Sequence, residues 1–237
     1  IAKMFKTELT PPLRALSAIA LMLPLCGVAA PTYSTLDYVQ DGLVVFYDGI
    51  ANGGMNGETE IHVPDAETWA DLSGNGHHLY QDSSYLYATY TGAWPWTENG
   101  LVMTNVANGK ATLYPCAPSV TMNWNKMTIE AVHTEIYAPN GNMYPFWSQI
   151  NSKAFVNIFV NGQKKLFCTV PTSDTATSQI NKDLSSVSRD GTHSLRYDPA
   201  NSIYALVFNG EQLASANSSS FKKFGEQTTD FEVGNHR

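Results

Sequence analysis

The chain has 237 residues, of which 43% are hydrophobic and 15% charged, and its formal net charge is −7. This length allows one all-β domain or two small domains, and the hydrophobic share is too high for an intrinsically disordered chain. The acidic balance leaves no basic patch to neutralise phosphates, so nucleic acid is not an expected partner. Plentiful tyrosine, glycine, asparagine, serine and threonine favour strands joined by turns.

The first thirty residues have the three parts of a secretory signal peptide. Lys6 and Arg14 lead into the apolar run 15–25, and a small-residue stretch, 26–30, follows it. The apolar run is about half of the roughly 20 residues that a membrane-spanning helix needs. We therefore expect a helical signal peptide over 1–30, starting at Met4 and cleaved near its end, with lipidation as the alternative. The mature chain is then secreted or held at the cell surface, without a transmembrane segment.

The residues that follow predict a succession of short strands. The first apolar run, 43–47, precedes a long excursion, 49–68, that is rich in glycine, asparagine and acids. Asn161-Gly162 and Asn209-Gly210 each separate two strand runs, which is the strongest short-range signal for a hairpin. Residues 171–190 are expected to be irregular. The other expected strands are 78–81, 100–104, 111–114, 127–137, 144–148, 154–160, 163–170, 192–197, 202–208, 211–214 and 231–234.

These strands predict an all-β domain, a single antiparallel two-sheet β-sandwich of jelly-roll type. We assign 1–30 to the signal peptide, 31–42 to a lead-in segment and 43–237 to the sandwich. An immunoglobulin-type domain is disfavoured, because its Cys–Trp–Cys arrangement is not apparent.

Two cysteines, Cys116 and Cys168, remain after removal of the signal peptide. An oxidising compartment permits a disulfide between them. The alternative is two buried thiols, since free cysteine is commonly buried. The sequence has no Cys-x-x-Cys motif, so neither a zinc ribbon nor a thioredoxin-type site is supported.

The segment 69–77 predicts a tight, oxygen-rich loop between two strands. Asp71, Asn75 and backbone carbonyls there are hard oxygen ligands of the kind that calcium prefers. The alternative is that Asp71 and Ser73 cap the loop through hydrogen bonds to its backbone. Asp48, Asp65 or Asp82 would complete a calcium shell if the fold brings them near.

An aromatic cluster is the candidate carbohydrate-binding site. Trp94 and Trp96 are two residues apart and share a face if the chain is extended there, and Tyr85 and Tyr87 lie close by in sequence. Aromatic rings have broad apolar faces that suit sugars in shallow sites. The alternative is that the tryptophans serve as core residues or loop anchors.

The order of five segments carries a resemblance to a known family. The segments are 43–49, 69–77, 127–131, 204–211 and 231–234. Together they resemble bacterial laminin-G-like domains of the concanavalin A-like lectin/glucanase superfamily. The resemblance implies a jelly roll that is exported or surface-displayed and binds glycans or proteins, sometimes with calcium. In that family a further strand normally follows the last segment, so the resemblance also implies a domain truncated at its C-terminal end, with an unprotected edge.

The glucanase branch of this superfamily carries its catalytic acids on one strand, as Glu-x-Asp-x-Glu or with one more residue before the last Glu. Glu130 and Glu135 have the longer spacing, but Val132 occupies the middle acid position. A separation of five places the two glutamates on opposite faces of a regular strand. We therefore expect no catalytic residues, and His133 is expected to be a half-exposed strand residue.

The sequence thus favours an exported, non-catalytic recognition or adhesion module that binds carbohydrate or a cell-surface protein. One alternative is an accessory or catalytic domain of a polysaccharide-processing glycoside hydrolase. The other is a structural surface protein with no small-molecule ligand.

Overall fold

The computed structural model describes residues 41–56, 59–81, 93–103, 113, 115–133, 142–151, 154–161, 164–184, 191–221 and 223–233. The predicted signal peptide lies outside these residues. The described chain is built of strands and turns, with one short 3₁₀ helix, η2 (Pro199–Asn201). Within these ranges the structure contains no helix with the length and hydropathy to cross a membrane.

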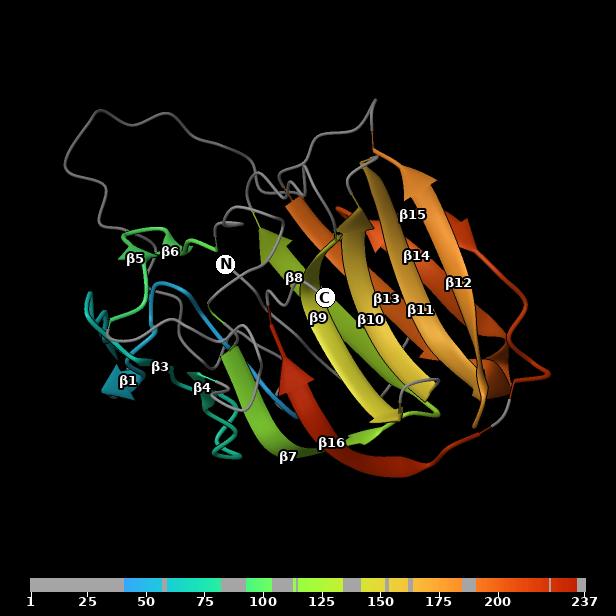
Figure 1. Ribbon diagram of the computed structural model, residues 1–237, viewed down its shortest axis with the longest axis horizontal. Coiled ribbons are helices and arrows are strands. Elements are labelled where there is room, and N and C mark those ends of the chain that lie inside the picture. The colour runs from blue at the N-terminus through green and yellow to red at the C-terminus, as the bar shows by residue number, and fades with distance from the viewer. Residues whose placement is uncertain are drawn as a thin grey trace, which may run out of the picture.

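Two antiparallel sheets form the body of the molecule (Figure 1), an eight-stranded large sheet and a four-stranded small sheet. The large sheet has the order β12 (Ala176–Asp183), β11 (Lys165–Ser173), β10 (Ala154–Asn161), β9 (Asn142–Asn151), β16 (Glu226–Glu232), β7 (Pro115–Asn123), β4 (Leu79–Gln81) and β3 (Thr68–Trp69). The small sheet has the order β15 (Glu211–Ser215), β14 (Ile203–Phe208), β13 (Gly191–Asp198) and β8 (Met127–His133). Two short pairs, β1 (Met55–Asn56) with β2 (Thr59–Glu60) and β5 (Trp96–Thr97) with β6 (Gly100–Leu101), lie at one end of the molecule.

The chain passes between the sheets in the manner of a jelly roll. It runs from β7 in the large sheet to β8 in the small one, returns for β9 to β12, crosses again for β13 to β15, and ends with β16 in the large sheet. The predicted antiparallel two-sheet sandwich is therefore confirmed. The last described strand, β16, pairs with β7 on one side and β9 on the other, so it is not the unprotected edge that the family resemblance implied.

Alternation of side chains places the core between the two sheets. Ile158 on β10 lies opposite Cys168 on β11, and Val160 lies opposite Leu166; all four are buried. The hydroxyl group of Tyr204 on β14 reaches across the core and lies 2.9 Å from the carbonyl oxygen of Cys168. This contact ties the small sheet directly to the backbone of the large one.

Both predicted Asn-Gly hairpins occur, but their turns differ. Asn209 and Gly210 both have positive φ, 47° and 85°, and they alone connect β14 to β15, as a two-residue turn requires. The first hairpin has a longer connection, because β10 extends through Asn161 and β11 begins only at Lys165. Lys164, with φ of 61°, takes the left-handed conformation there. The longer turn sets a register in which the apolar residues of both strands share the inner face.

Two other predictions about strands are wrong. The stretch 171–190, expected to be irregular, contains β12, an edge strand on which Ile180 is the one fully buried residue. Its polar sequence is compatible with a strand because, in the part of the chain that the structure describes, only one edge is paired and most side chains meet water. Conversely, the apolar run 43–47 is buried but forms no regular strand.

The proposed disulfide between Cys116 and Cys168 is also wrong, and the alternative of two buried thiols is confirmed. Cys116 lies on β7 and Cys168 on β11, and three strands of the same sheet separate them. At a strand spacing of about 4.8 Å the two residues are about 19 Å apart, far beyond the reach of a disulfide. Burial raises the pKa of the Cys168 thiol, which keeps it protonated.

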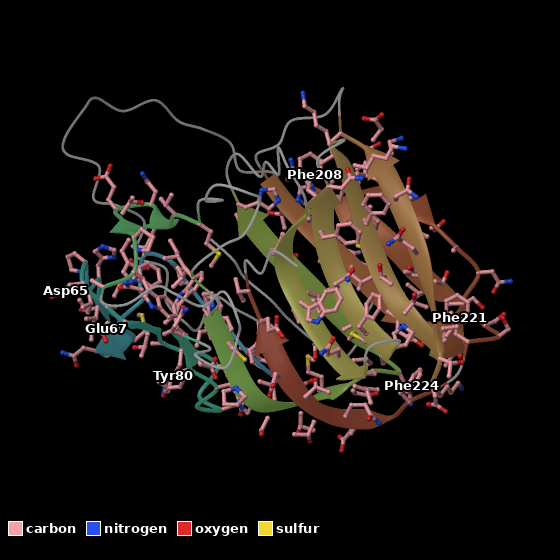
Figure 2. All side chains as sticks on the ribbon, viewed as in Figure 1. Asp65, Glu67, Tyr80, Phe208, Phe221 and Phe224 are labelled. Atoms are coloured by element: carbon pink, nitrogen blue, oxygen red, sulfur yellow. The ribbon has the colours of Figure 1, made fainter. Side chains whose placement is uncertain are left out.

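Two histidines stack at one end of the small sheet. The rings of His133 on β8 and His193 on β13 lie 4.5 Å apart at 15°, with Nε2 of His133 in contact with Nδ1 of His193. The other face of His193 stacks on Phe208, which Figure 2 labels at the end of β14. Burial, and then the charge of His133, lowers the pKa of His193 to about 3. His133 is half-buried, as predicted.

The buried His193 predicts a loss of stability in acid. Its pKa is about 6.5 in the unfolded chain and about 3 in the fold, so below pH 6.5 the unfolded chain binds the proton first. The stabilising contribution is complete above pH 6.5 and is lost towards pH 3 at about 1.4 kcal/mol per pH unit. Between pH 6 and about pH 4 the unfolding free energy of His193→Phe, measured with urea, should therefore fall less steeply than that of the wild type.

Gln212→Phe, at an exposed position on β15 outside this stack, provides the control: it introduces the same side chain without removing a histidine and should keep the wild-type slope. Equal slopes for wild type and His193→Phe would contradict the prediction.

Candidate functional site

The loop 69–77 is organised by the carboxylate of Asp71. Its Oδ1 accepts hydrogen bonds from the backbone N–H groups of Phe46 and Ser73, both at 2.9 Å. Its Oδ2 accepts from the Ser73 hydroxyl at 2.8 Å and from the N–H of His77 at 3.0 Å. Four donors therefore converge on this carboxylate, and the alternative interpretation, in which Asp71 and Ser73 cap the loop, is confirmed.

Two more of the predicted calcium ligands, Asn75 and Asp48, also bind backbone. Asn75 donates from Nδ2 to the carbonyl oxygens of Leu43 and Val44, at 3.0 and 2.9 Å. Asp48 Oδ1 accepts from the N–H of Ile50 at 2.8 Å. In the described ranges no group of three histidine, cysteine, aspartate or glutamate side chains could hold a metal ion. The donors around these side chains favour loop closure over metal binding.

The arrangement around Asp71 predicts a stability defect. In Asp71→Asn an amide nitrogen replaces one acceptor oxygen and faces two hydrogen-bond donors, so the free energy of unfolding should fall by about 2–3 kcal/mol in urea titrations. Asp65→Asn is the matched control, because Asp65 is exposed at the same end of the molecule (Figure 2).

Millimolar calcium chloride should leave the melting temperature of the wild-type chain unchanged, since four donors already occupy the carboxylate. A rise in melting temperature that chelation reverses would show that a metal takes these oxygens, contrary to the prediction.

Only part of the predicted aromatic cluster lies within the described residues. Trp94 is 3% exposed and stacks on Trp96 at 6.0 Å, and Trp96 meets Trp69 edge-on at 5.3 Å. The indole N–H of Trp96 donates to the carbonyl oxygen of Ala66 at 2.9 Å. These contacts favour the interpretation as loop anchors. Tyr85 and Tyr87 lie outside the described residues, so a sugar contact by the cluster stays a prediction.

The glutamate on β8 has a structural partner. Ile129 and Ala131 are buried between the sheets, so Glu130 points to the opposite face, where its Oε2 accepts a hydrogen bond from the Ser194 hydroxyl at 3.2 Å. Glu135 lies outside the described residues, and the expectation that the two glutamates do not form a catalytic pair stays a prediction.

A row of side chains crosses the outer face of the large sheet. The register of the strands places one residue of each strand from β4 to β12 in this row. In that order the residues are Tyr80, Cys116, Glu232, Trp147, Asn157, Thr169 and Gln179. On each strand a residue next to the row is buried between the sheets, as Leu79, Phe146 and Ile158 are. Because neighbouring side chains of a strand point to opposite faces, the whole row points outward. Figure 2 labels Tyr80, which is 48% exposed, at the start of this row.

Four aromatic side chains flank the centre of the row. Trp147 stacks on Phe155 with ring centroids 4.7 Å apart, and Phe159 stacks on Phe167 at 4.6 Å. Trp147 and Phe159 are almost completely buried, while Phe155 and Phe167 are half-buried. Asn157 lies between Phe155 and Phe159 on β10 and beside Trp147 on β9. We call these five residues the outer-face site.

Asn157 is the unusual member of the outer-face site. The residue is 1% exposed, and within the described chain its Oδ1 accepts no hydrogen bond. The neighbouring Thr169 receives a hydrogen bond from Gln179 Nε2 at 3.1 Å. A buried acceptor without a donor destabilises the fold, and in native proteins it calls for an explanation. A ligand hydroxyl at this oxygen would supply the missing donor.

Sequence reasoning did not find the outer-face site, although part of its signal was present. Phe155, Asn157 and Phe159 alternate along one predicted strand and therefore share a face. Trp147 joins them only through the pairing of β9 with β10, and Phe167 only through the register of the first hairpin. Neither register could be read from the sequence.

Comparisons with known proteins assign no family. No family model matches the chain, and no curated protein matches it. Among solved structures, the carbohydrate-binding module CBM40 of the Ruminococcus gnavus IT-sialidase, bound to α2,3-sialyllactose, has 16% identity and a TM-score of 0.35 over 45% of this chain and 60% of that chain.

Two further structures have similar scores. A family 16 endo-glucanase from Bacteroides ovatus has 14% identity and a TM-score of 0.34, over 52% of this chain and 61% of that chain. The receptor-binding domain of botulinum neurotoxin D has 10% identity and a TM-score of 0.37, over 73% of this chain and 44% of that chain. The chain thus spans less than two thirds of each of these structures, and the laminin-G-like identification stays a prediction.

Proposed function

We propose that the chain is a non-catalytic carbohydrate-recognition domain that binds its glycan at the outer-face site. The observation that carries the proposal is the buried Oδ1 of Asn157, which is unpaired within the described chain and has four aromatic side chains around it. A sugar offers hydroxyl donors beside apolar C–H surfaces, and this site offers an acceptor beside apolar rings. The match is one of chemistry, and because Asn157 is only 1% exposed, the proposal requires that the groups covering its Oδ1 move aside when the glycan binds.

The row of polar groups supports an oligosaccharide as the ligand. From Glu232 to Gln179 the row crosses five neighbouring strands, which at a spacing of about 4.8 Å extends over about 19 Å. Glu232 lies at one end of this row and Gln179, whose Nε2 donates to Thr169 Oγ1 at 3.1 Å, lies at the other. Such a length suits several linked sugar units, with Asn157 at the centre.

Export to the cell surface or the medium forms part of the proposal and rests on the predicted signal peptide, 1–30. There the domain would meet polysaccharides or the glycans of other cells. Glycoside hydrolysis is the second candidate function, because the carboxylate of Glu232 lies in the row next to Trp147.

The proposal predicts that one substitution separates binding from folding. Asn157→Leu removes the buried unpaired acceptor, so its melting temperature should equal or exceed that of the wild type. Its affinity for the glycan, identified on a glycan array and measured by titration calorimetry, should fall at least about tenfold, which corresponds to about 1.4 kcal/mol. Gln212→Leu, at an exposed position on β15, is the matched control and should bind as the wild type does.

Two kinds of experimental result would contradict the proposed function, and they can be told apart. An array that returns no glycan, or a glycan that Asn157→Leu binds as tightly as the wild type, would refute the proposed site. Release of reducing ends from a polysaccharide that Glu232→Gln abolishes would establish a hydrolase instead.

A further inference from the structure

The strand β16 is acidic, while its neighbours in the large sheet are uncharged. It contains Glu226, Asp230 and Glu232 and no basic residue. The adjacent strands, β7 and β9, and the next ones, β4 and β10, contain no charged residue at all. The first basic residue in a described strand across the sheet from β16 is Lys165 on β11, which lies opposite Asp183 on β12. The strands around β16 therefore provide no positive charge to balance its three acids.

The three acids of β16 point to the outer face of the large sheet, where the outer-face site lies. Phe231 is 1% exposed between the sheets, and Gln227 lies opposite the buried Met122 of β7, so the odd-numbered positions of β16 point inward. The even-numbered positions, which include all three acids, point outward. Thr228 follows this pattern, because its hydroxyl group lies 2.7 Å from that of the exposed Thr121 on β7.

Asp230 is the exposed acid next to the outer-face site. Its Oδ1 accepts a hydrogen bond from the N–H of Ser119 at 3.3 Å, and within the described chain no hydrogen bond reaches its Oδ2. It lies two residues from Glu232, which the strand register places beside Trp147. Two residues along β16 and two strand spacings across the sheet put Asp230 about 12 Å from Asn157. Neighbouring units of one oligosaccharide can bridge this separation.

We propose that the glycan of the outer-face site is an oligomer of amino sugars, with an ammonium group of the sugar against the carboxylate of Asp230. The inference rests on the proposed function and names its class of ligand. The buried Oδ1 of Asn157, which has no donor within the described chain, is the independent sign of a ligand here. Aromatic faces also attract cations, and the ring of Phe155 is only half-buried. An acidic sugar beside Asp230 would meet a like charge, which disfavours it.

Three hexasaccharides with the same linkage test the charge of the ligand. Cellohexaose, the N-acetylglucosamine hexamer and the glucosamine hexamer differ only at the second carbon, which carries a hydroxyl, an acetamido or an ammonium group. Titration calorimetry on the full chain at about pH 6 keeps the amine charged, because a comparable α-amino group has a pKa of about 7.7. At low salt the glucosamine hexamer should bind at least about tenfold more tightly than either neutral hexamer. The difference should shrink towards about 1 M salt, which screens exposed charges.

A pair of variants tests the location of the charge contact. Asp230→Asn removes the charge but keeps an oxygen for the N–H of Ser119, so its melting temperature without sugar should stay that of the wild type. Its preference for the glucosamine hexamer should fall at least about threefold, which is within the range of an exposed ion pair. Glu211→Gln makes the same change of net charge at an exposed position on β15 of the small sheet, and it should keep the wild-type preference.

Several results would overturn the inference. They are no binding by the glucosamine hexamer, equal affinity for the three hexamers, and a preference that Asp230→Asn retains. An equal loss of preference in Glu211→Gln would also overturn it, because the net charge of the chain would then be the cause. The proposed function is tested separately by Asn157→Leu. If this variant binds a neutral glycan more weakly than the wild type does, while ammonium groups bring no gain, the outer-face site is supported and only the amino-sugar inference fails.

Discussion

The alternation of side chains across the large sheet is the constraint on which most of this structure depends. One set of positions, such as Phe146, Ile158 and Cys168, is buried against the small sheet, and the intervening set forms the outward row. A one-residue slip of β10 against either neighbour would move Asn157 into the core and Ile158 onto the surface. The register that builds the core therefore also builds the outer-face site.

Asp71 provides a second organising contact where regular pairing fails. Among the described residues the segment 43–47 has no neighbouring strand on the loop side, and side chains of the loop replace a ladder. Asp71 holds Phe46, and Asn75 holds Leu43 and Val44. The strand-like sequence of 43–47 consequently folds as a buried extended segment, secured by an acid and an amide.

Local chemistry was predictable from the sequence, while long-range register was not. The Asn209-Gly210 turn, the antiparallel sandwich and the capping role of Asp71 follow from residue types and short spacings. β12 was not predicted because an edge strand with one buried side chain has no alternation of apolar and polar residues in its sequence. The prediction of a disulfide was wrong because both cysteines are buried, and burial does not specify which strands lie side by side. Trp147 and Asn157 meet only after folding, so no sequence pattern could join them.

The outer-face site also explains why a buried polar group can persist in a sheet built on apolar packing. Leucine at position 157 would satisfy the packing around Phe155 and Phe159 without an unpaired oxygen, so stability alone does not account for asparagine there. A residue that costs stability in the free protein is retained when a bound partner supplies the missing hydrogen bond.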